Sequence, residues 1–144
     1  MARLNGKTAI LSGRYEILHG GHVRTIRRFG KMYSKLYVYI VSNPDSIVPN
    51  QWTKELMDYC VIDLKNVIVV IDSCHFGYAT QDDLERLPKY HDFLSCNSDV
   101  TAHLRGLGVN VVEFERAPGY SSTQYKDKLL QEALTSWRRN SEKP

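Results

Sequence analysis

Residues 7–22, KTAILSGRYEILHGGH, join a strand-like run to a helix-like run across a set of glycines. Residues 7–12 are mostly apolar, as in a buried strand, and Gly13 closes the run. The run that follows, residues 22–33, spaces its apolar residues along one face of a helix. A strand, a glycine turn and a helix in direct succession are typical of the first half of a βαβ unit.

The same alternation continues along the chain. Strand-like runs are expected at 35–42, 67–71, 91–95 and 109–114, and helix-like runs at 52–65, 82–87, 100–107 and 121–138. The pattern predicts an α/β fold, a Rossmann-like three-layer α/β/α sandwich with a five-stranded parallel sheet. We expect residues 1–144 to form one domain, with a basic, frayed tail from about residue 138.

Composition is that of a soluble globular protein, with 42% hydrophobic and 24% charged residues. The formal net charge of +3 suits an anionic small ligand but not a nucleic-acid partner. The three cysteines lack CxxC spacing, which disfavours a disulfide framework and a four-cysteine zinc site. With no signal-like or membrane-length apolar run in the sequence, we expect a cytoplasmic protein without a membrane partner.

Two glycine-containing stretches, GRYEILHGGH (13–22) and RAPGYSST (116–123), follow predicted strands and lead into predicted helices. Parallel strands end at the same edge of a sheet, where Rossmann-like folds bind ligands, so one shared site is expected. Helix N-termini offer unpaired N–H groups and partial positive charge, which favours a phosphorylated ligand. Walker A and GxGxxG sequences do not occur, which argues against P-loop NTPases and ordinary dinucleotide dehydrogenases.

His19 and His22 are three residues apart, so they share one helix face beside Gly20 and Gly21. As donors near a phosphate, they could stabilise the charge of a five-coordinate transition state. The alternative is structural: His19 in a loop and His22 partly buried with an internal partner. Zinc would need Glu16 as a third ligand and is disfavoured, so no protein-bound metal is expected.

The second stretch also has two interpretations. Ser121 with Gln124 forms a capping box that would start a helix without any ligand. Arg116 and the hydroxyl residues from Ser121 onward also suit a polyphosphate, and the two roles are compatible.

Together the two stretches resemble the signature motifs of the cytidylyltransferase-like nucleotidyltransferases. GRYEILHGGH resembles GxFDxxHxGH, and RAPGYSST resembles RTxGISTT. The residues that match are Gly13, His19, Gly21, His22, Arg116, Gly119, Ser121 and Thr123. The departures are Tyr15, Glu16, Ala117, Tyr120 and Ser122. Among family members, the small glycerol-3-phosphate cytidylyltransferases are of similar length.

The resemblance implies an enzyme that transfers CMP from CTP to a phosphorylated alcohol or sugar and releases pyrophosphate, with Mg²⁺ or another divalent cation. His19 and His22 would be the catalytic residues. The nucleotide and its phosphates would be bound by Gly13, Arg14, Tyr15, Glu16, Gly21, Arg116, Gly119, Tyr120, Ser121, Ser122 and Thr123. Contacts with the base or the acceptor would come from Lys54, Asn97 and Asp99.

Other functions stay open. The Gly13-Arg14-Tyr15 start is also similar to the GRFQPxHxGH opening of nicotinamide-mononucleotide adenylyltransferases, which use ATP. The family's acceptor-binding lysines have no clear counterpart, with Lys54 the nearest cation, so a non-catalytic nucleotide-binding module is a further alternative. Relatives are often dimers, which makes a homodimer an additional expectation.

Overall fold

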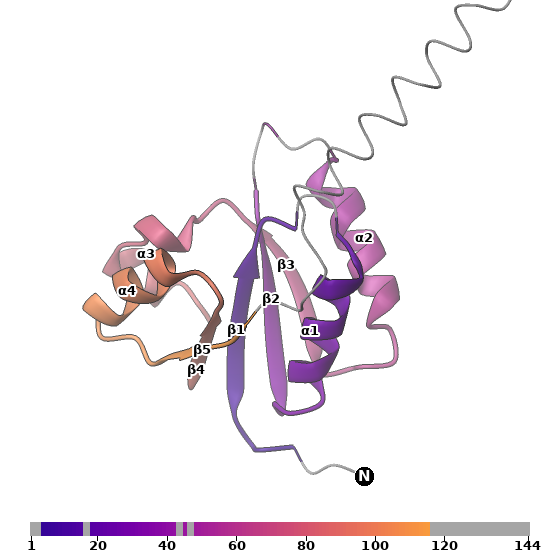
Figure 1. Cartoon of the computed structure of the whole chain (residues 1–144), viewed down its shortest axis with the longest axis horizontal. Helices are drawn as coiled ribbons and strands as arrows, with labels where there is room; N and C mark the ends of the chain where they lie inside the picture. The colour runs from indigo at the N-terminus through magenta and orange to yellow at the C-terminus, as the bar shows by residue number, and fades with distance from the viewer. Residues whose placement is uncertain (1–3, 16–17, 43–44, 46–47, 116–144) are drawn as a thin grey trace, which may run out of the picture.

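The structure of the chain is a computed structural model, which describes residues 4–15, 18–42, 45 and 48–115 (Figure 1). The strands of this part are β1 (Thr8–Gly13), β2 (Lys35–Val41), β3 (Val67–Asp72), β4 (Asp92–Ser95) and β5 (Val111–Glu113). Its helices are α1 (Gly20–Gly30), α2 (Asn50–Cys60), α3 (Gln81–Glu85) and α4 (Ser98–Gly106), with a 3-10 turn, η1 (Phe76–Tyr78). No helix among these residues is long and apolar enough to span a bilayer.

The strands form one parallel sheet in the order β3-β2-β1-β4-β5. The central strand β1 pairs on both edges, so that Ala9 lies level with Leu36 of β2 and with Asp92 of β4. After β3 the chain returns to the other side of β1, and the strand order reverses between β1 and β4. The predicted Rossmann-like fold with a five-stranded parallel sheet is confirmed.

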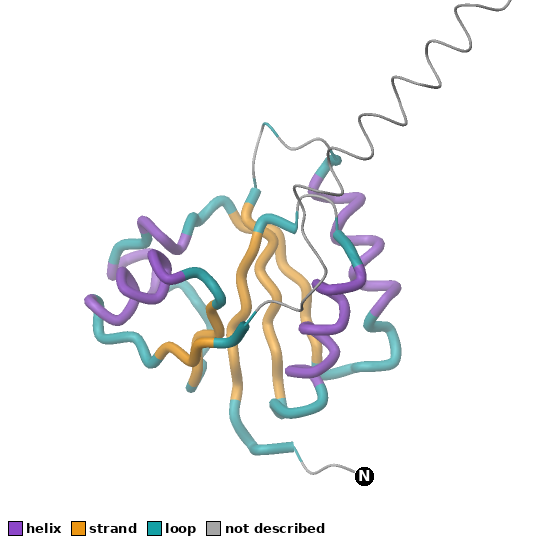
Figure 2. The backbone as a smooth tube through the Cα atoms, in the orientation of Figure 1, coloured by secondary structure: helices purple, strands orange, loops and turns teal. Residues whose placement is uncertain are grey.

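Helices cover both faces of the sheet: α1 and α2 on one, and η1, α3 and α4 on the other (Figures 1 and 2). Successive strand residues point to opposite faces. Ala9 and Leu11 therefore enter the core on the α1 side, whereas Ile10 enters the core on the α4 side. Because both faces are buried, the strands read as continuous apolar runs rather than as alternating ones.

Several boundaries differ from the predicted ones, for local reasons. The first helix begins at Gly20 rather than at residue 22, because His19 caps it. The helix predicted at 82–87 is α3, which begins at Gln81 because Thr80 and Asp83 form a capping box. The last described strand is shorter than 109–114, since Gly108 takes φ +84° in the turn that leaves α4. The predicted helix at 121–138 lies outside the described residues.

Helix α2 turns a different face to the core than its apolar spacing indicates. Thr53 and Met57 are its buried residues, and Val61 follows them into the α1-side core. Leu56 and Tyr59, which contribute to the helix-like spacing of 52–65, are exposed.

One arginine ties the α1/α2 layer together. The Arg27 guanidinium donates to both carboxylate oxygens of Asp63, at 2.7 and 2.8 Å, and to the Cys60 carbonyl at 3.1 Å. Its hydrogen bonds to Asp63 lower the pKa of that carboxyl to about 2. Arg27 thus holds α1 against the turn that follows α2, a role that its position within the helix-like run 22–33 does not reveal.

Two helix-terminal glycines allow a matched test of the packing between α1 and β3. A Cβ added at Gly30 would lie 2.8 Å from Val67 Cγ2, whereas one added at Gly106 would meet nothing within 4 Å. We expect Gly30→Ala to destabilise the protein by about 1–3 kcal/mol through overpacking. Gly106→Ala should stabilise it by up to about 1 kcal/mol, because alanine lowers the entropy of the unfolded chain. Urea unfolding measures both, and equal midpoints would contradict the close contact at Gly30.

Candidate active site

The candidate site lies at the carboxyl ends of β1 and β4, the two neighbouring strands between which the strand order reverses. From β1 the chain passes to the start of α1, and from β4 it passes within a few residues to the start of α4. Both helices therefore begin at this edge of the sheet (Figure 1). Ligands of open α/β sheets bind at such a point.

His19 and His22 form a reciprocal capping box at the start of α1. His19 is the N-cap, with extended backbone (φ −134°, ψ 175°), and its Nδ1 accepts a hydrogen bond from the Gly21 N–H at 3.1 Å. His22 Nδ1 in turn accepts from the His19 N–H at 3.3 Å. The two imidazoles thus do the work that a serine and a glutamate do in the usual capping box.

This arrangement fixes the tautomers of both rings. A nitrogen that accepts a hydrogen bond carries no proton, so each neutral ring holds its proton on Nε2. The two rings stack, with their centroids 3.8 Å apart and their planes 20° apart. Burial lowers the pKa of His19 below 6.5, which favours the neutral ring at pH 7. In both rings Nε2 is therefore the nitrogen that can donate a hydrogen bond.

Tyr15 packs against the His22 ring of this pair. Its side chain is buried, and its ring meets the His22 ring edge-on with the centroids 5.0 Å apart. Its backbone is left-handed (φ 50°), which costs a non-glycine residue about 1 kcal/mol or more. A Cβ on Gly13 would lie 3.1 Å from the Tyr15 ring, so the glycine makes room for it. Contact between Tyr15 and a nucleotide stays a prediction, whereas its packing against His22 is observed.

Of the other candidates of the first motif, the structure describes two and leaves one outside the described residues. Arg14 is exposed, and Gly21 is buried in the first turn of α1, where its N–H is used by His19. Glu16 lies outside the described residues, and so does any zinc site that would include it. Within residues 4–15, 18–42, 45 and 48–115, no group of three or more His, Cys, Asp or Glu side chains could hold a metal ion.

Asn97 and Asp99 have structural roles at the start of α4. Asn97 Oδ1 accepts from the N–H groups of Asp99 and Val100, at 2.9 and 3.3 Å, as an N-cap does. Asp99 is in the first turn, where its charge interacts favourably with the helix dipole. By contrast, the first turn of α1 contains no acidic residue. An anion is therefore favoured at α1 rather than at α4, and contacts of Asn97 and Asp99 with a ligand stay predictions.

Lys54 lies one turn inside α2 and donates to Asp58 Oδ2 at 2.6 Å. This i,i+4 ion pair accounts for its position without a ligand. Its role in acceptor binding stays a prediction.

Cys96 is a residue of this edge that the sequence did not single out. It follows β4 directly, is exposed, and is close enough to Tyr15 to contribute, after burial, to raising the pKa of the Tyr15 hydroxyl. The signal available in the sequence is its position immediately after a predicted strand, since its spacing to other residues matches no motif.

The second motif lies outside the described residues. This applies to Arg116, Gly119, Tyr120, Ser121, Ser122 and Thr123. The described chain ends at Glu115, just past the carboxyl end of β5. Phe114 packs edge-on against Phe29 of α1, with ring centroids 5.2 Å apart. The chain therefore leaves the described part on the α1 side of the sheet, close to the first motif's helix.

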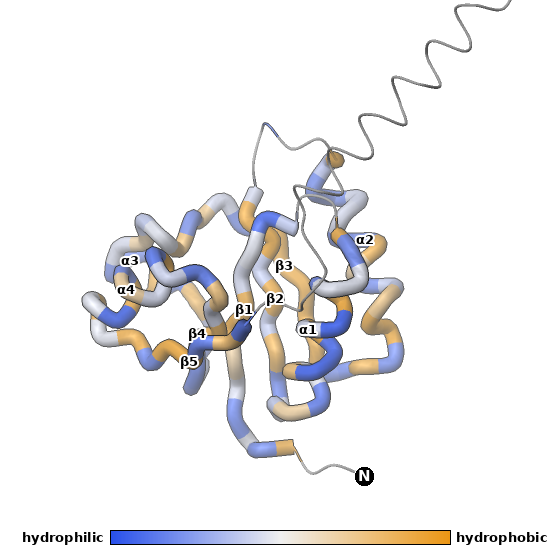
Figure 3. Tube along the Cα trace, viewed as in Figure 1, coloured by the Kyte–Doolittle hydropathy of each residue, from blue (hydrophilic) through white to orange (hydrophobic). Residues whose placement is uncertain are grey.

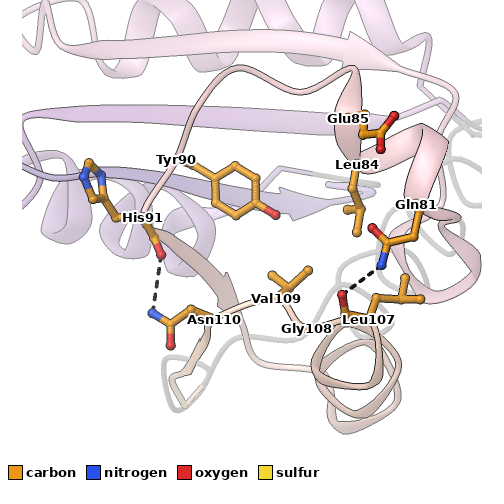
Figure 4. Close-up of a pocket in the computed structure, with 9 residues that line it drawn as sticks. All are labelled: Gln81, Leu84, Glu85, Tyr90, His91, Leu107, Gly108, Val109 and Asn110. Atoms are coloured by element: carbon orange, nitrogen blue, oxygen red, sulfur yellow. Dashed lines mark hydrogen bonds between the residues drawn. The ribbon is translucent and has the colours of Figure 1, made fainter.

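A pocket of about 400 Å³ lies at the opposite edge of the sheet, near the amino ends of β4 and β5 (Figure 4). Its polar side chains bond within the lining: Gln81 Nε2 donates to the Leu107 carbonyl at 3.0 Å, and Asn110 Nδ2 donates to the His91 carbonyl at 3.4 Å. Asn110 Nδ2 also donates to Asp92 Oδ1 at 2.7 Å. These bonds join α3 to the end of α4 and the turns that precede β4 and β5, and so account for the Gln81 and Asn110 amides without a ligand.

Comparison with solved structures supports the fold. A bifunctional NMN adenylyltransferase/ADP ribose pyrophosphatase from Francisella tularensis matches 85% of this chain with a TM-score of 0.66 and 13% identity. Its complex with AMP and a manganese ion matches 85% of the chain with a TM-score of 0.62 and 13% identity. This chain covers 42% and 41% of those two chains, about two fifths of their length.

A lipopolysaccharide core biosynthesis protein from Thermoplasma volcanium GSS1 matches 77% of this chain and 98% of its own, with a TM-score of 0.54 and 17% identity. No protein-family model and no curated protein sequence matches this chain. At these identities, the structural matches show that the chain shares the fold of these proteins.

Substitutions of His19 can distinguish the stability that it contributes as a helix cap from the pH dependence that its ring adds. Burial lowers the pKa of His19, so as the pH falls below 6.5 the unfolded chain takes up a proton before the folded chain does, and stability falls. His19→Asn keeps a strong N-cap without a titrating ring. We expect it to be at least as stable as wild type at pH 7 and to lose less stability between pH 7 and pH 5.

His19→Ala, which removes the cap, should cost about 1 kcal/mol at pH 7. Urea unfolding of the three proteins at both pH values provides the measurement. If wild type and His19→Asn lost equal stability on acidification, the link between the ring and the helix start would be wrong.

Proposed function

We propose that this chain is a nucleotidyltransferase, which transfers a nucleoside monophosphate from a nucleoside triphosphate to a phosphorylated acceptor and releases pyrophosphate. The observation that supports this function is the His19–His22 capping box at the start of α1, beside the point where the strand order reverses. Two imidazole N–H donors and a first helical turn without acidic residues suit a phosphate that gains negative charge.

In the proposed reaction, an oxygen of the acceptor phosphate attacks the α-phosphorus of the triphosphate. A new P–O bond forms as the bond to the bridging oxygen of the pyrophosphate breaks, and that oxygen keeps the electron pair. Negative charge spreads over the equatorial oxygens of the α-phosphate. The Nε2–H groups of His19 and His22 stabilise that charge as hydrogen-bond donors, and neither ring needs to gain or lose a proton.

A divalent cation belongs with the triphosphate in this proposal. Mg²⁺ is commonly held by substrate phosphates, waters and one or two carboxylates, rather than by a complete protein cage. The bound cation would neutralise the triphosphate charge. Arg116 and the hydroxyls of Ser121, Ser122 and Thr123 would take the β- and γ-phosphates, as the family resemblance implies.

Two nucleotides are candidates, each supported by a different observation. CTP, with a glycerol-3-phosphate-like acceptor, is supported by the match of both motifs to the cytidylyltransferase-like pattern. ATP is supported by the Gly13-Arg14-Tyr15 start and by structural similarity to an adenylyltransferase whose structure contains AMP. A homodimer remains a prediction for either enzyme.

The reaction can be tested with the purified chain, Mg²⁺ and each of CTP and ATP, against glycerol 3-phosphate, nicotinamide mononucleotide and sugar phosphates. We expect pyrophosphate release with one nucleotide and one acceptor class. Nucleotide binding without pyrophosphate release from any pair would contradict the transferase proposal and favour the binding module.

The histidine roles can be tested with variants that keep the caps. His19→Asn and His22→Gln preserve the two side-chain acceptors of the capping box but move the donors, so each should lower kcat about 10²–10³-fold. His91→Asn is the matched control, because His91 Nδ1 accepts from the Thr8 N–H at the opposite edge of the sheet. Its kcat should stay at the wild-type value. Full turnover in both cap-preserving variants would refute the catalytic assignment.

A further inference from the structure

Helix α2 carries an exposed apolar stripe on its outer face. Trp52, Leu56, Tyr59 and Ile62 expose 65%, 51%, 73% and 74% of their surface, and their spacing places them along one side of the helix and the turn after it. Apolar residues recur along α2 in Figure 3. Single exposed apolar residues are ordinary, but four large ones in a row, two of them aromatic, are typical of a surface that another segment covers.

We propose that this α2 stripe is the docking site of residues 121–138 of the same chain. That segment is predicted from its sequence to be an amphipathic helix. Its apolar face consists of Tyr125, Leu129, Leu130, Ala133, Leu134 and Trp137. At about 1.5 Å per residue, such a helix is long enough to cover a stripe that runs from residue 52 to residue 62. Packing the apolar face of this segment on the α2 stripe would remove both apolar surfaces from water.

The exit of the chain supports this occupant. Phe114 belongs to the α1-side core, although β5 lies at the far edge of the sheet beyond β4. The chain is therefore already on the face that α1 and α2 cover when the described part ends (Figure 1). Residues 116–120, at roughly 3.5 Å each when extended, can reach past α1 toward α2.

Charge supports it as well. The flanks of the stripe carry three carboxylates, Glu55, Asp58 and Asp63, and two of them are paired with Lys54 and Arg27. Glu55 accepts a hydrogen bond from the Gln51 amide. Because that amide is neutral, this bond does not offset the negative charge of Glu55. Residues 121–138 have a net positive charge, with Lys126, Lys128 and Arg138 against Asp127 and Glu132.

A second copy of the chain is a poorer occupant. In a two-fold contact the stripe would pair with itself, which brings Glu55 of both copies into the same interface. Like charges at an interface are unfavourable, whereas the basic segment offers opposite charge.

The test compares two tyrosines of similar exposure by hydroxyl-radical labelling of the full chain. Tyr59, in the stripe, exposes 73% of its surface in the described structure, and Tyr78, which follows β3 on the other side of the sheet, exposes 80%. If the segment docks, Tyr59 should be labelled several-fold more slowly than Tyr78. Leu130→Asp or Leu134→Asp, on the apolar face of the segment, should raise labelling of Tyr59 to the Tyr78 level. Gln131→Asp, which adds the same charge on the polar face, should leave it unchanged.

Labelling over a range of protein concentrations, with the mass followed by light scattering, distinguishes the occupants. Slow labelling of Tyr59 that does not depend on the mass, and that either leucine variant abolishes, is the expected result. Equal labelling of the two tyrosines in wild type would overturn the proposal. So would protection that is lost when dilution dissociates a dimer, or that persists in both leucine variants. None of these readouts uses enzyme activity, so the test is independent of the proposed reaction.

Discussion

Strand β1 is hydrogen-bonded along both edges, to β2 on one side and to β4 on the other, and this double pairing decides the position of every other element. Because β1 is parallel to both neighbours, the loops that follow β1 and β4 meet at the same end of the sheet. The chain must return past the sheet after β3 to reach β4, which places η1, α3 and α4 opposite α1 and α2. That return also brings Cys96, which follows β4, near Tyr15 in the connection from β1 to α1.

Two helices begin at this edge, and their first turns differ in charge. At α4, Asn97 caps the N-terminus and Asp99 already supplies a negative charge, so little attraction for a further anion is left. At α1, the caps are imidazoles and the basic residues Arg27 and Arg28 are in the last turn, where they complement the opposite end of the dipole. On the proposed function, this asymmetry favours the start of α1 over the start of α4 for a phosphate, even though both helices begin at the same edge of the sheet.

The sequence predicted the order and type of the elements well, because buried parallel strands leave continuous apolar runs such as 35–42 that are hard to mistake. It did less well where an unusual residue performs a common task. Histidine is not among the favoured N-caps, so nothing marked His19 as the start of a helix, and α1 was expected to begin two residues late. Likewise, the bidentate contact of Arg27 depends on the position of Asp63 in the turn after α2, which the sequence does not show. Asn97 is recognisable as an N-cap only when the first residue of α4 is known. Helix α2 shows a different limit: an apolar spacing is the same whether the core or another segment covers it.

The double use of His19 has a consequence for how such a protein would evolve. The codons for histidine differ by one base from those for asparagine and aspartate, and both of these residues are favoured N-caps. A single-base change at position 19 would therefore leave the helix start, the sheet edge and the shape of the site intact. On the proposed mechanism it would also remove one of the two imidazole donors. A single substitution at position 19 would thus separate an active protein from a folded but inactive one. Inactive descendants that still fold should therefore arise easily.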